Sequence, residues 1–335
     1  MNPCVTIITP CYNGEAFLDK YFKSILSQTY ENLELIFVND GSTDQTEEIA
    51  FSYREALEKR GIVYKYMYQP NGGQASAMNT GFREMTGEYL VWPDSDDLLL
   101  PDSIEKRVRF LEDNPGYGMV RSNAVALSHD AREIQFRFSN SENRFHEDIF
   151  LDLILEETYC ACGCYMIRTE LFRTIYPNLR IKTGRVGQNW QILIPMAGKY
   201  LCGYIDEDLY QVILWPQSHS RQKRTLKEEV ARRMGLKEVL LDGIWRSGRT
   251  DRDYQKIVDI KYDRILFHVH LDHGDLISAK GFYKRLSEEN AVTETDRLRY
   301  LKVYDPIGYH VHQLAKLVKR GIGKIKRMLL ENNRK

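Results

Sequence analysis

Residues 88–97 read EYLVWPDSDD, an apolar run that ends in three carboxylates within four positions. The apolar run predicts a buried strand, which places Asp94, Asp96 and Asp97 at its carboxyl end. Crowded carboxylates raise one another's pKa and destabilise a fold unless a cation or hydrogen-bond donors compensate them. Mg²⁺ and Mn²⁺ accept such oxygen ligands and fill their remaining positions with water and substrate phosphates. The segment therefore predicts metal-assisted chemistry on a phosphorylated substrate; the alternative is an acidic loop before a helix that begins at Pro101.

Strand and helix patterns alternate around this segment. Short β-branched or apolar runs predict strands at residues 5–9, 33–38, 63–68 and 89–92. Apolar residues at helical spacing predict helices over 15–28, around 49–53, over 74–85 and around 104–111. Strands separated by crossover-length helices indicate a parallel, doubly wound α/β sheet, in which ligands bind beyond the carboxyl ends of the strands. Polar segments follow the predicted strands, so we expect one crevice lined by residues 10–14, 39–44, 71–74 and 94–97.

The second half of the chain carries further patterns. They predict a hairpin over 118–127 and 132–138, a helix near 148–157, a strand over 160–168 and a helix over 169–175. The strand pattern puts Cys160, Cys162 and Cys164 on one face, which favours core cysteines over a metal site. Later helices are predicted over 226–245, 254–273 and 276–289, with breaks at Gly248 and Gly274. These patterns divide the chain into residues 1–222 and a helical region over residues 223–335.

The composition argues against several classes of protein. Lys plus Arg and Asp plus Glu both number 47, and a net charge of zero gives no indication of a nucleic-acid partner. No apolar stretch approaches the roughly 18 to 20 residues that span a bilayer, and the first strand pattern begins at Val5 without a charged leader. We expect the six cysteines to be free thiols and the protein to be cytoplasmic. Neither a dinucleotide fingerprint nor a P-loop is present, which argues against a Rossmann dehydrogenase or a P-loop NTPase.

Several motifs follow one another along the first third of the chain. They read VTIITPCYNG at 5–14, SQTY at 27–30, VNDGSTD at 38–44, NGG at 71–73, NTG at 79–81 and GEY at 87–89, before the acidic cluster. Together they resemble family 2 glycosyltransferases, strongly over residues 3–112 and more weakly to about residue 220. The resemblance implies a GT-A fold, a doubly wound mixed sheet flanked by helices, with a C-terminal helical extension. It assigns the nucleotide-sugar-binding half to residues 1–112 and the acceptor half to residues 113–222.

The resemblance also implies roles for individual residues. By analogy, Pro10 and Tyr12 line the nucleoside pocket, and Asp40 accepts a hydrogen bond from the base, usually uracil. Asp94 approaches the ribose and the donor sugar, while Asp96 holds Mg²⁺ or Mn²⁺ on the diphosphate. Asp97 either joins them or caps the next helix. Further nucleotide-sugar contacts are implied at Asn13, Gly41, Gly73, Asn79 and Ser95. A bound metal stabilises the negative charge that leaves with the nucleoside diphosphate.

The general base is the missing part of this assignment. In the family, a carboxylate at the start of a later helix usually deprotonates the acceptor hydroxyl, and the matching place here holds Gln188 and Asn189. An amide cannot accept a proton at neutral pH, whereas a positioned base contributes about 10² to 10⁴ in rate. Three explanations stay open: the base is Asp206, Glu207 or Asp208; folding brings in another carboxylate; or transfer proceeds without a conventional base, or not at all.

Four further features each allow two interpretations. Trp190 is either a platform for the acceptor sugar or a core tryptophan. His219 lies near the diphosphate or metal in similar enzymes, and the alternative is an ordinary surface histidine. The neighbouring Arg221, Lys223 and Arg224 either bind phosphate oxygens or form a solvated basic loop. Residues 313–330 form a basic amphipathic pattern, which predicts peripheral contact with an anionic membrane or a helix packed on its own domain.

We therefore predict a metal-dependent, inverting, hexosyltransferase-like enzyme. It would move a sugar from a nucleotide sugar, with UDP as the expected nucleotide, to a glycan or lipid-linked acceptor in surface polysaccharide synthesis. One alternative is a nucleotidyltransferase, which would normally need a phosphate-gripping loop that residues 10–14 do not offer. Another is a catalytically silent nucleotide-sugar-binding protein, suggested by the amides at Gln188 and Asn189.

Overall fold

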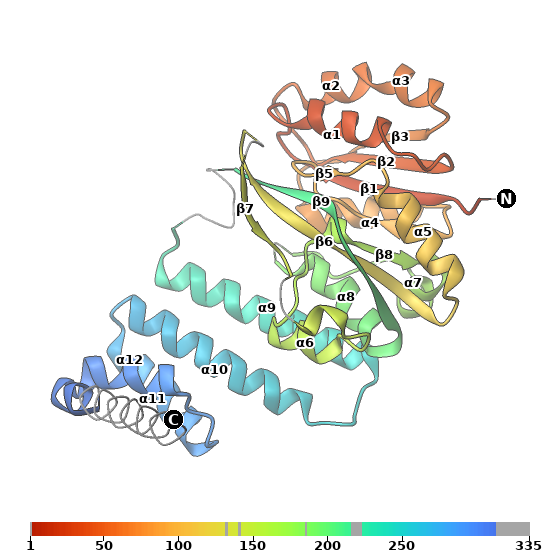
Figure 1. Cartoon of the computed structure of the whole chain (residues 1–335). Helices are drawn as coiled ribbons and strands as arrows, with labels where there is room; N and C mark the ends of the chain where they lie inside the picture. The colour runs from red at the N-terminus through yellow and green to blue at the C-terminus, as the bar shows by residue number, and fades with distance from the viewer. Residues whose placement is uncertain (1, 131–132, 140–141, 185, 216–222, 313–335) are drawn as a thin grey trace, which may run out of the picture. The chain divides into compact units, whose positions relative to one another are not determined.

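The computed structural model of the chain describes residues 2–130, 133–139, 142–184, 186–215 and 223–312 (Figure 1). The chain forms two compact units. The first consists of residues 1–224 and 234–258, and the second of residues 225–233 and 259–335. None of the described helices combines the length and the apolar character that crossing a bilayer requires.

A mixed sheet forms the core of the first unit. Its described strands are β1 (Val5–Cys11), β2 (Leu33–Asn39), β3 (Val63–Tyr68), β4 (Tyr89–Val91), β5 (Leu98–Leu99), β6 (Tyr117–Ser128), β7 (Ile134–Arg137), β8 (Tyr165–Arg168) and β9 (Leu201–Leu214). They lie in the order β3-β2-β1-β4-β8-β6-β9-β5, and β7 pairs with β6. Strands β1 to β4 pair in parallel, whereas β8 is antiparallel to both β4 and β6. The expected doubly wound, mixed α/β sheet is confirmed.

Helices cover this sheet, as the periodicity predicted (Figure 1). They are α1 (Leu18–Leu26), α2 (Thr46–Ser52), α3 (Arg54–Lys59), α4 (Gln74–Glu84), α5 (Ser103–Asp113), α6 (Phe150–Leu155), α7 (Thr169–Ile175) and α8 (Gln188–Lys199). In α1, Leu18, Phe22 and Ile25 are fully buried at helical spacing. In α4, a Cβ on Gly81 would lie 2.5 Å from Ile8 of β1, so glycine lets this helix approach the sheet closely. All residues of β1 and β2 are buried, as expected for strands covered on both faces.

The structure corrects two local predictions. The segment expected as one helix around residues 49–53 forms α2 and α3. The strand expected over 160–168 begins only at Tyr165, because Cys162–Cys164 forms a 3₁₀ turn that ends in β8. The three thiols therefore do not share a strand face. All six cysteines are free, as expected.

Strand β9 was not predicted, although it is 14 residues long. Its pairing with β6 shifts in register: Ser122 lies opposite Ile205, and the next residue, Asn123, lies opposite Asp208. The intervening acidic residues bulge out of the pairing, so their charges remain at the surface. Three consecutive acids in the sequence look like a loop, which is why local patterning did not reveal this strand.

The C-terminal region is helical, with α9 (Leu226–Ser247), α10 (Tyr254–Asp272), α11 (Leu276–Glu288) and α12 (Glu294–Tyr304). The first three match the predicted helices closely, and α12 was not predicted. Gly248 and Gly274 follow α9 and α10 with φ of +71° and +77°, the left-handed conformation that commonly ends a helix. Within the second unit, α12 begins with a capping box between Thr293 and Asp296.

Candidate active site

The loops that follow β1 and β2 are joined by hydrogen bonds. The Asn13 main-chain N–H donates to Ser42 Oγ at 2.9 Å, and Asn13 Oδ1 accepts from the Thr43 N–H at 2.9 Å. Asn13, expected as a nucleotide-sugar contact, thus uses its side chain to hold the neighbouring loop. Pro10 is buried, whereas Tyr12 is 46% exposed and offers an open aromatic face beside this loop.

Asp40 binds the loop between β3 and α4. Its buried carboxylate accepts hydrogen bonds from Gln69 Nε2 at 2.6 Å and from the main-chain N–H groups of Gly72 and Gly73 at 2.9 and 2.8 Å. Gly41 has φ of +74°, and a Cβ there would lie 2.6 Å from the Asn71 nitrogen. An ionised carboxylate has about four acceptor directions, so three donors leave one for a ligand.

Asp94 belongs to a chain of side-chain amides. Asp94 Oδ1 accepts from Gln74 Nε2 at 2.7 Å, and Gln74 Oε1 accepts from Gln188 Nε2 at 2.5 Å. The Cys162 thiol also hydrogen-bonds to Asp94. Burial raises the pKa of the Asp94 carboxyl, although both hydrogen bonds oppose that effect. The first residue of α4 and the first residue of α8 therefore meet at the carboxyl end of β4.

Asp97 has a structural role. Its buried carboxylate accepts from the Tyr210 hydroxyl at 2.9 Å and from the Ile213 N–H at 2.9 Å. Both partners belong to β9, so Asp97 fixes this strand beside the acidic segment. The expected alternative, a cap on the following helix, is wrong, because the residue before α5 is Asp102.

Asp96 differs from its neighbours. Among the described residues, its carboxylate forms no hydrogen bond to another side chain. Burial, with the nearby Asp94 charge, raises the pKa of Asp96 to about 7. The described residues contain no group of three or more His, Cys, Asp and Glu side chains arranged around a metal. Two carboxylates still fit Mg²⁺ or Mn²⁺, because these ions take their other ligands from water and substrate phosphates.

The amides at the start of α8 lie at this site. Asn189 Oδ1 accepts from Trp92 Nε1 at 3.2 Å, and Asn189 Nδ2 donates to the Cys160 carbonyl at 3.3 Å. With Gln188 bonded to Gln74, both side chains connect α8 to the end of β4. The position at which the general base was expected therefore holds two amides that are hydrogen-bonded to other residues of the protein.

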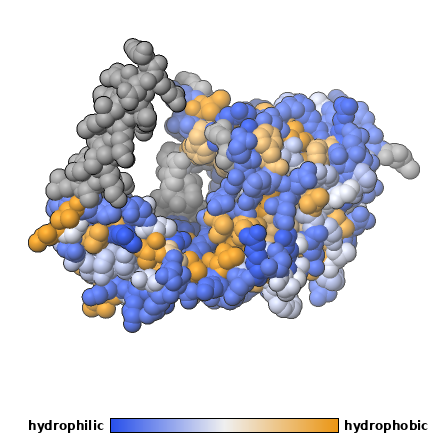
Figure 2. Space-filling view, turned by 60° about the horizontal axis from the view of Figure 1, so that its bottom comes forward, coloured by the Kyte–Doolittle hydropathy of each residue, from blue (hydrophilic) through white to orange (hydrophobic). Residues whose placement is uncertain are grey.

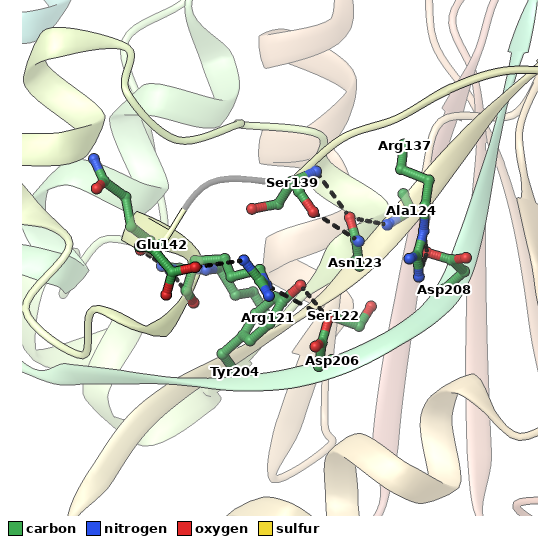
Figure 3. Close-up of polar contacts among 12 residues, drawn as sticks. Arg121, Ser122, Asn123, Ala124, Arg137, Ser139, Glu142, Tyr204, Asp206 and Asp208 are labelled. Atoms are coloured by element: carbon green, nitrogen blue, oxygen red, sulfur yellow. Dashed lines mark hydrogen bonds and ion pairs between the residues drawn. The ribbon is translucent and has the colours of Figure 1, made fainter. Parts of the chain in front are cut away.

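The three acids proposed as alternative bases form ion pairs along β9, and Figure 3 shows two of them, Asp206 and Asp208. The pairs are Asp206 with Arg144 at 3.7 Å, Glu207 with Lys106 at 2.5 Å and Asp208 with Arg137 at 2.9 Å. Each acid is therefore already paired with a cation of the same unit. The structure gives no support to a base among them.

Three of the expected ligand contacts are buried residues that bond within the protein. Trp190 is 7% exposed, and its indole hydrogen-bonds to Cys160, so it cannot serve as an acceptor platform. Asn79 is 4% exposed, and its amide pairs with both the N–H and the C=O of Ile181 at 2.8 and 2.9 Å. Ser95 is also buried and hydrogen-bonds to Cys11. His219 lies outside the described residues.

Sequence reasoning placed Gln74 in the expected crevice and named Gln188, but it missed Gln69 and gave no role to the Gln74 side chain. Gln69 and Gln74 flank the Asn-Gly-Gly loop and bind Asp40 and Asp94 respectively. Their position on either side of a glycine loop next to the expected crevice was the available signal. Cys162 and Tyr210 gave no such signal, because their contacts with the acidic segment depend on strands that are distant in sequence.

Comparison with known proteins identifies the kind of fold that carries this site. The family model described as Glycosyl transferase family 2 matches residues 6–176. An uncharacterised glycosyltransferase of Rickettsia typhi is 44% identical over 110 residues, which are 33% of this chain and 32% of that protein. Glycosyltransferase GlyA of Streptococcus pneumoniae is 31% identical over 190 residues, 56% of this chain and 23% of GlyA. The matches thus span about a third or less of the length of these curated relatives.

Two solved structures share the architecture. S. aureus TarS in complex with UDP-GlcNAc has a TM-score of 0.54 at 16% identity, covering 89% of this chain and 79% of that one. Mannosyltransferase PcManGT from Pyrobaculum calidifontis, in complex with GDP-Man and Mn²⁺, has a TM-score of 0.52 at 17% identity, covering 96% and 87%. At such identities the likeness shows the fold, which is of the GT-A type.

Proposed function

The chain belongs to glycosyl transferase family 2, and from that premise we propose that it transfers a sugar from a nucleotide sugar to a glycan or lipid-linked acceptor. One observation carries the proposal. A single loop, residues 72–74, donates main-chain N–H groups to Asp40 and a side-chain amide to Asp94. Two carboxylates from different strand ends are thereby bonded to one loop, which supports a site where a nucleoside and its diphosphate bind together.

The nucleotide is proposed to lie across this loop. Tyr12 offers an exposed ring to the nucleoside, and Asp40 retains one acceptor direction for a base N–H. A uracil N–H fits that acceptor, which supports a UDP-sugar as donor. TarS was solved with UDP-GlcNAc and PcManGT with GDP-Man, so the fold admits more than one nucleotide.

Asp96 and Asp94 are the residues that we propose to hold Mg²⁺ or Mn²⁺. When bound, the metal would neutralise negative charge on the departing diphosphate. Gln74 keeps Asp94 oriented by its 2.7 Å hydrogen bond, and Asp97 keeps β9 next to the acidic segment. The acceptor would attack the anomeric carbon from the side opposite the leaving group, which inverts the configuration.

Replacing Asp96 tests the proposal directly. Because Asp96→Asn removes a charged metal ligand, we expect Mn²⁺-supported binding of UDP to weaken at least tenfold in calorimetry, while the melting temperature does not fall. Asp102→Asn is the matched control, since Asp102 is paired with Lys106 at 41% side-chain exposure. Undiminished Mn²⁺-supported UDP binding by Asp96→Asn would refute the assignment.

A catalytically silent nucleotide-sugar-binding protein is the second candidate. The engaged amides of Gln188 and Asn189, and the ion-paired acids of β9, favour it. Release of free nucleoside diphosphate during incubation with UDP- and GDP-sugars, acceptors and Mn²⁺ distinguishes the two. An enzyme releases it with turnover, whereas a silent protein binds the donor and leaves it intact.

We place the protein in the cytoplasm, with peripheral contact at the inner face of the membrane. Six free cysteines support a reducing compartment. The basic amphipathic pattern of residues 313–330, which lie outside the described residues, supports contact with anionic lipid.

A further inference from the structure

The buried face of α5 carries two polar side chains next to one another. Ser103 and Arg107 are four residues apart in this helix, and both are fully buried. Side chains at this spacing lie one above the other, and a helical side chain leans toward the turn that precedes it. The guanidinium of Arg107 and the hydroxyl of Ser103 therefore extend from the same side of α5.

Arg107 has few hydrogen-bond partners for a buried guanidinium. Its Nη2 donates to Ser122 Oγ of β6 at 3.2 Å. Among the described residues, its Nε and Nη1 have no hydrogen-bond partner, and neither has Ser103 Oγ. The Ser122 hydroxyl accepts from Arg107 and keeps its own proton to donate. Buried polar groups are nearly always hydrogen-bonded, so this set of donors indicates a bound species between α5 and β6.

The charge of Arg107 is not balanced by an acid of the protein. The groups that act most on it are the Cys164 thiol and the phenols of Tyr159 and Tyr210, none of which is a carboxylate. Burial raises the pKa of all three, so they are uncharged at neutral pH. Burial lowers the pKa of Arg107 to about 10, so the guanidinium remains charged there. An unpaired charge in the interior is strongly destabilising unless an opposite charge compensates it.

Arg121, the residue before Ser122 on β6, is a buried arginine with more compensation (Figure 3). Its Nη2 donates to three carbonyl groups between residues 143 and 146, and its guanidinium lies over the Tyr204 ring, 5.6 Å from the centroid. Both kinds of contact favour a cation. Burial acts to lower the pKa of Arg121, yet its surroundings outweigh that effect and raise it, whereas burial prevails at Arg107.

We propose that α5 and β6 enclose a binding site for a small monovalent anion of the size of chloride, held by Arg107 and Ser103. The N–H groups of Arg107 only donate, whereas a water molecule accepts about two hydrogen bonds and must place its own protons on acceptors. An anion accepts from several donors at once and neutralises the guanidinium. One guanidinium matches one negative charge, so a divalent anion would leave a buried charge unpaired. The site lies beside Tyr210, whose hydroxyl holds Asp97.

Melting temperatures of the full chain in sodium chloride and in sodium gluconate at equal concentrations test this site. Gluconate is too large to be enclosed between a helix and a strand, so it supplies the ionic strength without the ligand. An anion that binds only the folded protein raises the melting temperature as its concentration increases. We expect the wild type to melt at least about 3 °C higher in chloride.

Three variants locate the source of the chloride effect. Arg107→Met replaces the cation with an apolar side chain of similar length, and we expect the difference between the two salts to disappear. Ser103→Ala removes one donor and should raise the chloride concentration of half-maximal effect about tenfold. Arg109→Met is the matched control on the same helix, because the Arg109 side chain is 83% exposed, and it should keep the full effect.

Crystals grown in bromide locate the anion directly, because bromide replaces chloride and scatters X-rays anomalously. We expect an anomalous peak in contact with Arg107 Nε or Nη1. A map without a peak there, or a chloride effect that persists in Arg107→Met, overturns the proposal. If Arg107→Met does not fold, the bromide map and the Ser103→Ala titration decide, and a half-maximal concentration unchanged in Ser103→Ala counts against the site.

Discussion

Glu34 shows how the sheet accommodates a buried charge at the scale of a single residue. Its carboxylate accepts from Thr6 Oγ1 at 2.5 Å, from Lys65 Nζ at 2.7 Å and from the Thr86 N–H at 2.9 Å. Burial acts to raise the pKa of Glu34, but these hydrogen bonds and the lysine charge outweigh it and leave the pKa below its usual value. Glu34 therefore stabilises the fold in its ionised form.

We predict that Glu34→Gln lowers the free energy of unfolding at pH 7 by about 3 kcal/mol, because Lys65 loses its buried partner. Since the folded pKa of Glu34 is depressed, its contribution is fully present above the unfolded pKa of about 4.3 and is lost as pH falls through the lower folded value. Urea unfolding at pH 7 and pH 3 measures the difference between mutant and wild type. A difference that stays the same at pH 3 would contradict this linkage.

Asp19→Asn serves as the comparison for Glu34. Asp19 pairs with Lys23 at 2.7 Å, but its side chain is 59% exposed and its partner 67%. We expect its replacement to change the free energy of unfolding by no more than about 0.5 kcal/mol, because exposed i,i+4 pairs are weak.

At the scale of elements, the loop after β2 depends on Gly41. Alanine there would meet both a positive φ of +74° and the Asn71 nitrogen at 2.6 Å. Gly61 has a similar φ of +86°, but no heavy atom lies within 4 Å of the added Cβ. A comparison of the two glycines therefore separates the effect of backbone strain from that of a collision with the loop at Asn71.

We predict that Gly61→Ala costs about 1 kcal/mol of stability and leaves UDP binding unchanged. Gly41→Ala should cost more and weaken UDP binding at least tenfold, because displacing Asn71 moves the N–H groups that hold Asp40. Thermal melts and calorimetry on both variants measure these effects. Equal UDP affinity in the two variants would show that the loop contact is irrelevant to binding.

At the scale of the whole molecule, apolar side chains are exposed on the second unit (Figure 2). Ile277, Ile307 and Val311 are 89%, 79% and 60% exposed. Ile307 and Val311 are four residues apart, and the sequence continues with Leu314 and Val318 at steps of three and four residues, the spacing of one helix face. Lys316, Lys319, Arg320, Lys324, Lys326 and Arg327 lie within the same basic pattern. Apolar residues interleaved with cations suit an anionic membrane surface.

Deleting residues 313–335 should therefore release the protein from phosphatidylserine-containing vesicles. Each basic residue near such a surface contributes about 1 kcal/mol, so we expect at least a hundredfold loss of affinity in vesicle sedimentation. Phosphatidylcholine vesicles provide the control, and binding to anionic vesicles should weaken with added salt. If the full chain and the deletion variant sediment equally with anionic vesicles, residues 313–335 are not the membrane anchor.

The sequence by itself determined the alternation of strands and helices from β1 to β4, although it did not reveal β9. It also determined which polar segments follow the strands: β3 and α7 have the predicted bounds, and Asp40 and Asp94 both contact the Gly72–Gly73–Gln74 segment as expected for one crevice. Such features follow from local periodicity and from the common direction of parallel strands.

Only the tertiary structure decided which polar and aromatic residues serve the crevice and which serve the core. Asn79 is paired with Ile181, 102 residues away, and Asp97 with Ile213, 116 residues away. Trp190 is buried, and Gln188 reaches Asp94 through Gln74. The same polar and aromatic residue types occur both among residues that line a ligand site and among residues of the core. The burial and the hydrogen-bond partners of such a residue depend on segments that come together only in the folded sheet. The local sequence around the residue does not indicate which distant segments those are.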